Sequence, residues 1–209
     1  MKTPKKSIIF DMDGTLSDTA KATTVACNKI GQQFGTPNVN ESDVRSVMGY
    51  ADPEFFYRLY PGQPHELLNK IRYEVNELED NMITELGKSI LFPGVEELLT
   101  DLSEKGYNLY IASTGSKYHV HTTLTAGGIE HLFTGIHCGE PVKIKMVSDI
   151  IEGHDKDKYL MVGDMHKDSE AAKANGVFVL GVAFGYLDLD DYPLFDAILK
   201  TPHDLYSFL

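Results

Sequence analysis

The sequence has few cysteines, no long apolar run and no secretory-type start. Its two cysteines, Cys27 and Cys138, lie far apart in the chain, so they suggest neither a disulfide framework nor a paired metal motif. No apolar stretch approaches the roughly 18 residues of a transmembrane helix. Only a short apolar run precedes Asp11, and it is shorter than the core of a signal peptide. These absences exclude a disulfide-stapled or membrane-spanning protein and favour a cytoplasmic location.

Cationic side chains are also scarce. Lysine and arginine total 19 against 31 aspartates and glutamates, which gives a formal net charge of −12. Nucleic acids and anionic membranes bind positively charged surfaces, so the sequence argues against both as partners. The chain has 209 residues, of which 42% are apolar. That length and composition suit one domain, or one domain with an insert, around a sizeable core.

Several short, continuous apolar runs are bounded by turns, as is typical of strands buried on both faces of a parallel sheet. Segments with helical spacing of apolar residues lie between them. This alternation predicts an α/β fold, a Rossmann-like doubly wound parallel sheet with right-handed crossovers. The predicted strands cover residues 7–10, 108–113, 159–163 and 177–183, and the helices of this part cover about 95–102, 142–153 and 167–175.

The segment 16–88 interrupts this pattern after the first predicted strand. It contains no convincing strand, and its apolar spacing predicts helices over residues 20–34 and about 67–86, the second stopped by Gly87. We therefore expect an α/β core of residues 1–15 and 89–209 with an inserted all-α cap at 16–88. Such a cap could simply cover the sheet, or it could act as a lid, because ligands bind at the carboxyl ends of the strands from which it leaves.

Two carboxylates follow the first predicted strand. Asp11 and Asp13 are two positions apart and precede Gly14, which permits an unusual backbone conformation. Both side chains can face one site once the chain leaves the regular pleat. An aspartate-rich turn is the alternative, since aspartate and glycine are common in turns.

A second acidic cluster follows another predicted strand. Asp164 and Asp168 lie four positions apart, where a loop enters a helix. Two strands of one parallel sheet that each deliver aspartates at the carboxyl end would form an oxygen-rich site suited to Mg²⁺. Asp168 could instead, or in addition, cap the following helix.

Two weaker features complete the set. Ser113, Thr114 and Gly115 end a strand before a helix, a place where hydroxyls and backbone N–H groups bind phosphate oxygens. A lysine near position 143 could offset the carboxylates, and counting back from the apolar residues of the next helix favours Lys143 over Lys145.

Together these elements resemble the haloacid dehalogenase superfamily, specifically its phosphoglycolate phosphatase-like branch with a C1 helical cap. The resemblance covers nearly the whole chain. The matching positions are residues 11–15, Ser113, a lysine near 143, Gly163-Asp164 with Asp168, residues 92–95, and Gly181-Val182 followed by Gly185-Tyr186.

The resemblance implies a phosphatase that hydrolyses a small phosphorylated metabolite through an aspartyl-phosphate. Asp11 would be the nucleophile, and Asp13 would protonate the leaving oxygen and later deprotonate water. Mg²⁺ would be held by Asp11, the Asp13 backbone carbonyl and Asp164. Asp168 would orient the lysine or a metal-bound water.

The remaining expected site residues serve the phosphate and the leaving group. By the same resemblance, Ser113 and neighbouring N–H groups would bind the phosphoryl group, with Thr114 and Gly115 as further contacts, and Lys143 would stabilise Asp11.

The chain departs from many relatives in lacking a proline after the lysine and in having Thr114 where asparagine is common. Arg45 in the cap could bind a second anionic group, or form a surface ion pair. The scattered histidines are not expected to be ligands.

Two other functions stay open. A phosphomutase of the β-phosphoglucomutase type shares the fold, the cap and the first motif. A non-catalytic protein that only binds a phosphorylated metabolite would need an eroded set of site residues, which the sequence does not have. Dehalogenases of the superfamily lack the second acidic residue of the first motif, so Asp13 favours phosphoryl transfer. The sequence leaves the substrate, and the choice between monomer and homodimer, open.

Overall fold

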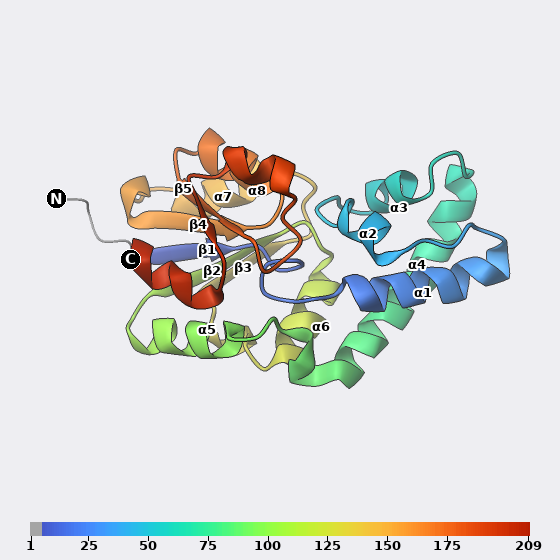
Figure 1. The fold of residues 1–209 in the computed structure, drawn as a ribbon, viewed down its shortest axis with the longest axis horizontal. Coiled ribbons are helices and arrows are strands. Elements are labelled where there is room, and N and C mark those ends of the chain that lie inside the picture. Colours follow the sequence, from blue (N-terminus) through green and yellow to red (C-terminus); the bar gives the residue numbers. More distant parts are fainter. Residues whose placement is uncertain (1–5) are drawn as a thin grey trace.

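The computed structural model describes residues 6–209, so residues 1–5, which we assigned to the core, lie outside the described part. Six parallel strands form one sheet in the order β3-β2-β1-β4-β5-β6 (Figure 1). This architecture confirms the predicted α/β fold class. The strands are β1 (Ser7–Phe10), β2 (Asn108–Ser113), β3 (Gly135–Cys138), β4 (Tyr159–Gly163), β5 (Phe178–Val182) and β6 (Ala197–Leu199).

The pairing register brings the ends of the three central strands together. Phe10, the last residue of β1, pairs with Ile111 of β2 and with Val162 of β4. The residues that follow these positions therefore emerge at one edge of the sheet. Every residue of β1 and β4 is buried, which explains why these strands are continuously apolar in sequence.

Helices cover both faces of the sheet (Figure 1). On one face lie α5 (Val95–Glu104) and α6 (Lys117–Gly127), and on the other lie α7 (Lys143–Ile151) and α8 (His166–Ala174). Each face has its own apolar cluster. Short 3₁₀ helices complete the chain: η1 (Gly87–Ile90), η2 (Glu130–Leu132), η3 (Lys156–Lys158), η4 (Leu189–Leu194) and η5 (Pro202–Phe208).

The cap contains four helices: α1 (Ala20–Phe34), α2 (Glu41–Arg45), α3 (Glu54–Leu59) and α4 (His65–Leu86). They lie beyond the carboxyl ends of the strands (Figure 1) and enclose a separate apolar cluster that includes Cys27, Phe56 and Leu68. The long helix α4 packs against α1 and also against α6 of the core. The cap therefore touches the core next to the strand ends.

The two connections between core and cap run side by side. Asp18 N donates to Ile90 O at 2.8 Å, and Phe92 N donates to Leu16 O at 3.0 Å. Ser17 and Leu91 face each other as an antiparallel bridge. The chain thus leaves the core and returns to it at almost the same place.

Two strands of the sheet were not predicted. β3 and β6 form its two edges and are short and mostly half-buried. Edge strands touch one neighbour only, so their sequences lack the continuous apolar run of the central strands. Both cysteines are free. Within residues 6–209, no helix combines the length and apolar character needed to span a membrane.

Candidate active site

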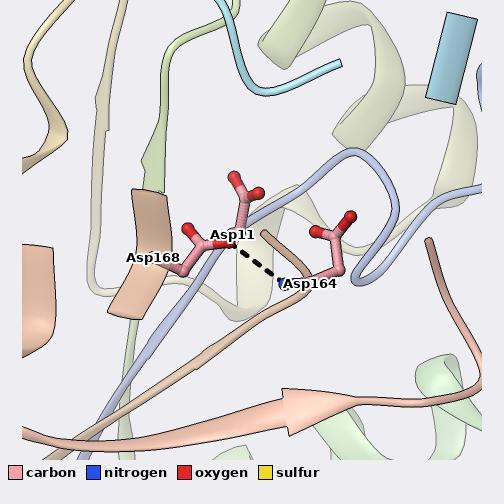
Figure 2. Close-up of side chains that lie close together, drawn as sticks. All are labelled: Asp11, Asp164 and Asp168. Carbon is pink, nitrogen blue, oxygen red and sulfur yellow. Dashed lines mark hydrogen bonds between the residues drawn. The ribbon is translucent and has the colours of Figure 1, made fainter. Parts of the chain in front are cut away.

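Three buried carboxylates meet at the carboxyl edge of the sheet (Figure 2). Asp11 follows β1, Asp164 follows β4, and Asp168 lies in the first turn of α8, with ligand oxygens all within 4.8 Å of one another. Gly14 has a positive φ of 81°, and a Cβ there would stand 2.3 Å from Asp164 Oδ2. A glycine at this position is therefore required for the first loop to pass so close to Asp164.

Lys143 provides the cation of this cluster. Its Nζ lies 2.8 Å from Asp11 Oδ1 and 2.6 Å from Asp168 Oδ1. The side chain is buried at the start of α7. Lys145 instead pairs with Asp149 at the protein surface. Of the two lysines considered from the sequence, Lys143 is the one that enters the site.

The cluster carries more negative charge than one lysine offsets. Burial raises the pKa of Asp11 to about 7, with Asp168 adding to the rise and Lys143 opposing it. Burial also raises the pKa of Asp164, and the carboxylates of Asp11 and Asp168 reinforce this effect. Among the buried side-chain atoms of the described residues, Asp164 Oδ2 has no hydrogen-bond partner. A hard divalent cation such as Mg²⁺ fits a carboxylate set with a free buried oxygen.

Asp168 has partners for both of its oxygens. Oδ1 accepts from Lys143 Nζ. Oδ2 accepts from Asp164 N at 3.0 Å (Figure 2) and from Met165 N at 2.9 Å. The latter bond is a capping contact of α8. Asp168 therefore holds both the lysine and the loop that carries Asp164.

The expected phosphate-binding segment ends β2. Ser113 is buried, and its Oγ accepts from Gly115 N at 3.1 Å. The Thr114 hydroxyl donates to the carbonyl of Gly49 in the cap at 3.3 Å. Ser116 begins α6 by accepting from His119 N. Ser113 and Gly115 thus lie at the core's site edge, whereas Thr114 contacts the cap.

Asp13 lies beside a histidine that sequence reasoning did not assign to the site. His119 Nε2 is 3.2 Å from both Asp13 oxygens, and Nδ1 is 3.0 Å from Asp80 Oδ1 on α4. Thr19 also donates to Asp13, at 2.8 Å. The only sequence signal for His119 is its place in the first turn of the helix that follows Ser113.

The charges around His119 reinforce one another. Burial alone would raise the pKa of Asp13, but the His119 charge and hydrogen bond bring that pKa below its ordinary value. Burial alone would lower the pKa of His119, yet Asp13, Asp80 and Glu79 hold it well above its ordinary value. These contacts favour the protonated form of His119, which lies between a carboxylate of the core and one of the cap.

A cavity of about 80 Å³ opens between cap and core beside Asp13, with Gly115 and His119 on its core side and Tyr50 on its cap side. Arg45 lies elsewhere. It lines a separate groove together with Asp164 and His166, forms an ion pair with Glu41, and lies 4.8 Å from the centre of the Tyr186 ring.

A parallel sheet that gathers aspartates and a lysine at its carboxyl edge, beneath a helical insert after the first strand, defines a haloacid dehalogenase-like hydrolase. The family model for haloacid dehalogenase-like hydrolases matches residues 8–182, and the chain belongs to this family. Curated relatives identify its enzyme class. A phosphoglycolate phosphatase of Synechococcus elongatus is 29% identical over 96% of this chain and 95% of the relative.

A second curated relative has the same name. This phosphoglycolate phosphatase of Vibrio vulnificus is 30% identical over 87% of this chain and 85% of its own length. The chain is accordingly a phosphoric monoester hydrolase, as the sequence predicted.

Among solved structures, a predicted phosphoglycolate phosphatase from Haemophilus somnus has a TM-score of 0.86 at 23% identity over 99% of both chains. A β-phosphoglucomutase from Clostridium difficile has a TM-score of 0.79 at 19% identity, covering 96% of this chain and 93% of its own. These two structural likenesses show the fold alone.

Proposed function

We propose that this protein is a Mg²⁺-dependent phosphatase of the cytoplasm that hydrolyses a small phosphate monoester through an aspartyl-phosphate intermediate. The observation that carries the proposal is the contact of Lys143 Nζ with Asp11, 2.8 Å away, inside a cluster of buried carboxylates. The lysine favours the ionised form of Asp11 against burial and Asp168, and the ionised form is the nucleophile.

Mg²⁺ would be held by Asp11, Asp164 and the backbone carbonyl of Asp13. When bound, the ion offsets the charge that accumulates as phosphate approaches the carboxylates. The unpartnered Asp164 Oδ2 supports this role. Asp168 has both oxygens engaged, so it acts by orienting Lys143 and the Asp164 loop.

The chain's own residues carry both chemical steps. An oxygen of Asp11 attacks phosphorus, the bond from phosphorus to the leaving oxygen breaks, and that oxygen takes a proton from Asp13. A water molecule then attacks the phosphorus of the aspartyl-phosphate and gives one proton to Asp13. The bond from phosphorus to the Asp11 oxygen breaks, so phosphate leaves and the Asp11 carboxylate is restored. Ser113 and the N–H groups before α6 bind the phosphoryl oxygens.

His119 can replenish the proton on Asp13. Its Nε2 is within hydrogen-bond distance of both Asp13 oxygens, and its pKa is raised whereas that of Asp13 is lowered. His119 can therefore supply the proton that Asp13 delivers to the leaving group. Asp80 holds the other ring nitrogen and thereby fixes the direction in which Nε2 points.

The test is phosphate release from p-nitrophenyl phosphate and a panel of phosphorylated metabolites, with Mg²⁺ and with EDTA. We expect activity with Mg²⁺, loss of activity with EDTA, and at least a 10⁴-fold lower rate, on the order of a lost nucleophile, in Asp11→Asn. Lys145→Met, which removes a surface lysine close in sequence to Lys143, is the matched control and should keep wild-type turnover. Turnover that survives Asp11→Asn would contradict the proposed mechanism.

A further inference from the structure

The leaving group must enter the cavity beside Asp13. In the proposed function Asp13 gives a proton to the leaving oxygen, so the alcohol released from phosphate lies next to this side chain. Asp13 lines the cavity of about 80 Å³ between cap and core. The groove that contains Arg45 opens instead on the side of Asp164 and His166. The lining of the first cavity therefore selects the substrate.

That lining is acidic. Its acidic and basic side chains, apart from the Tyr50 phenol, are the carboxyl groups of Asp13, Asp52 and Glu79 and the imidazole of His119, and burial raises the pKa of Glu79 to about 7. Asp52 lies before α3, and Glu79 projects from α4, so the cap contributes two of the carboxylates. Glu79 is buried and accepts from Thr23 at 2.5 Å. Asn76 lines the same wall and donates to Asp52 at 2.8 Å.

No free cation faces this space. Both ring nitrogens of His119 are engaged, one by Asp13 and the other by Asp80. None of the residues that line the cavity in the described chain is a lysine or an arginine. Arg72 forms an ion pair with Asp52 at 3.7 Å and lies over the Tyr73 ring, and it does not line the cavity.

Two further cations lie against Tyr50 without lining the cavity. Arg58 and Lys167 lie over the Tyr50 ring, 3.9 and 3.5 Å from its centre, and neither lines the cavity. A carboxylate on the leaving group would therefore be placed among Asp52 and Glu79 with no cation to pair with. An ammonium would find carboxylate acceptors, and a hydroxyl could donate to the same oxygens.

We propose that this cavity selects phosphate monoesters of small alcohols whose far end donates hydrogen bonds, with an ammonium preferred to a hydroxyl and a carboxylate rejected. The inference rests on the proposed phosphatase function. It separates this chain from its curated relatives, which are named for phosphoglycolate, because phosphoglycolate carries a carboxylate at the far end of its leaving group.

Three substrates of nearly equal size test the proposal: O-phosphoethanolamine, 2-hydroxyethyl phosphate and 2-phosphoglycolate. With Mg²⁺ at pH 8, above the raised pKa of Glu79, we expect kcat/KM to fall in that order. The difference between the first and the last should be about tenfold or greater, equivalent to about 1.4 kcal/mol. Inhibition constants against p-nitrophenyl phosphate should give the same ranking, including for any compound that turns over slowly. Equal values, or a preference for 2-phosphoglycolate, would overturn the proposal.

Variants connect the preference to the cap carboxylates. Asp52→Asn and Glu79→Gln should each reduce the ratio of kcat/KM for O-phosphoethanolamine over 2-phosphoglycolate by about threefold or more, that is by about 0.6 kcal/mol. Glu77→Gln, an equal change at an exposed position of the same helix, is the matched control and should leave the ratio unchanged. Asp52 is partly exposed, so its variant provides the test even if replacement of buried Glu79 reduces stability.

The measurements distinguish a failure of the inferred selectivity from a failure of the proposed phosphatase function. If p-nitrophenyl phosphate is hydrolysed but the ratio favours the carboxylate, or is the same in Asp52→Asn and in Glu77→Gln, the phosphatase stands and the selectivity is wrong. If no phosphate is released from any of the four compounds with Mg²⁺, both proposals are overturned.

Discussion

Two groups of carboxylates in this molecule each surround one basic side chain, but they are assembled differently. In the core cluster, Lys143 lies among Asp11, Asp164 and Asp168, all from strand ends and helix starts of the core. In the cap–core cluster, His119 joins Asp13 of the core to Asp80 of the cap. The core cluster is complete without the cap, whereas the cap–core cluster exists only when the two parts are together. In the proposed function, the core cluster would hold phosphate and metal, and the cap–core cluster would supply the acid only where cap and core are in contact.

The largest expected effect on catalysis that distinguishes the two clusters is that of replacing His119. His119→Asn should lower kcat for alkyl phosphates by about 100-fold, which is within the usual range for general acid–base groups, because Asp13 loses the partner that shares its proton. p-Nitrophenyl phosphate has a leaving group that departs readily without a proton, so its kcat should fall much less.

The comparison of the two substrates separates positioning from a loss of fold. His121→Asn, at an exposed histidine of the same helix, is the control and should behave as wild type on both. An equal loss on both substrates in His119→Asn would mean that His119 only supports the structure and would remove the functional distinction between the two clusters.

Magnesium should act on the core cluster alone. At about 100 times its Kd, Mg²⁺ should stabilise the fold by about 3 kcal/mol, which raises Tm by roughly 5–10 °C for a chain of this size. The increase should be greater at pH 8 than at pH 6, because the raised pKa of Asp11, about 7, means that Mg²⁺ must displace a proton at the lower pH. Thermal unfolding with Mg²⁺ and with EDTA measures this shift.

Asp164→Asn should abolish the shift, while Asp80→Asn should retain it. If Asp80→Asn removed the Mg²⁺ effect as fully as Asp164→Asn, the two clusters would not be independent.

The smallest expected effect concerns the cap. Burial raises the pKa of Glu79 to about 7, with Asp13 and Asp80 adding to the rise. In the unfolded chain the pKa of this side chain is 4.5. Between pH 4.5 and about pH 7, the folded state therefore keeps a proton on Glu79 that the unfolded state has lost. The free energy of unfolding therefore falls as the pH rises through this window. From pH 5.5 to pH 8 the loss due to Glu79 should be about 2 kcal/mol.

Urea unfolding at the two pH values measures this loss. Glu79→Gln should remove most of it and make the variant more stable relative to wild type at pH 8 than at pH 5.5. Glu77→Gln should follow the wild-type dependence. A Glu79→Gln variant whose stability changes with pH as the wild type does would show that Glu79 is not held protonated by burial.

The residues of the core cluster could be predicted from the sequence because they follow predicted strands. Asp11 and Asp164 come directly after continuous apolar runs, and the carboxyl ends of parallel strands share one edge. The apolar spacing of the next helix also favoured Lys143 over Lys145. These features are local in the sequence. Because parallel strands end at one edge of the sheet, the residues that follow them lie close together in the fold.

The cap–core cluster could not be read in the same way. His119 and Asp80 have no motif, and they meet only because α4 packs against α6. The lining by Asp52 and Glu79 depends on the same packing. Arg45 has a cationic side chain near the site, but its direction follows from Glu41 and Tyr186. Contacts between the cap and the core depend on packing that periodicity and spacing do not encode.

The paired connections between core and cap have a consequence for how such a protein can change in evolution. Because the chain departs after Leu16 and returns at Phe92 with a hydrogen bond between them, the 75 or so residues in between can be lengthened, shortened or exchanged as one block without altering the register of the sheet. If the proposed function holds, selection on the inserted block would change which alcohol is accepted, while the chemistry at phosphorus would be inherited unchanged.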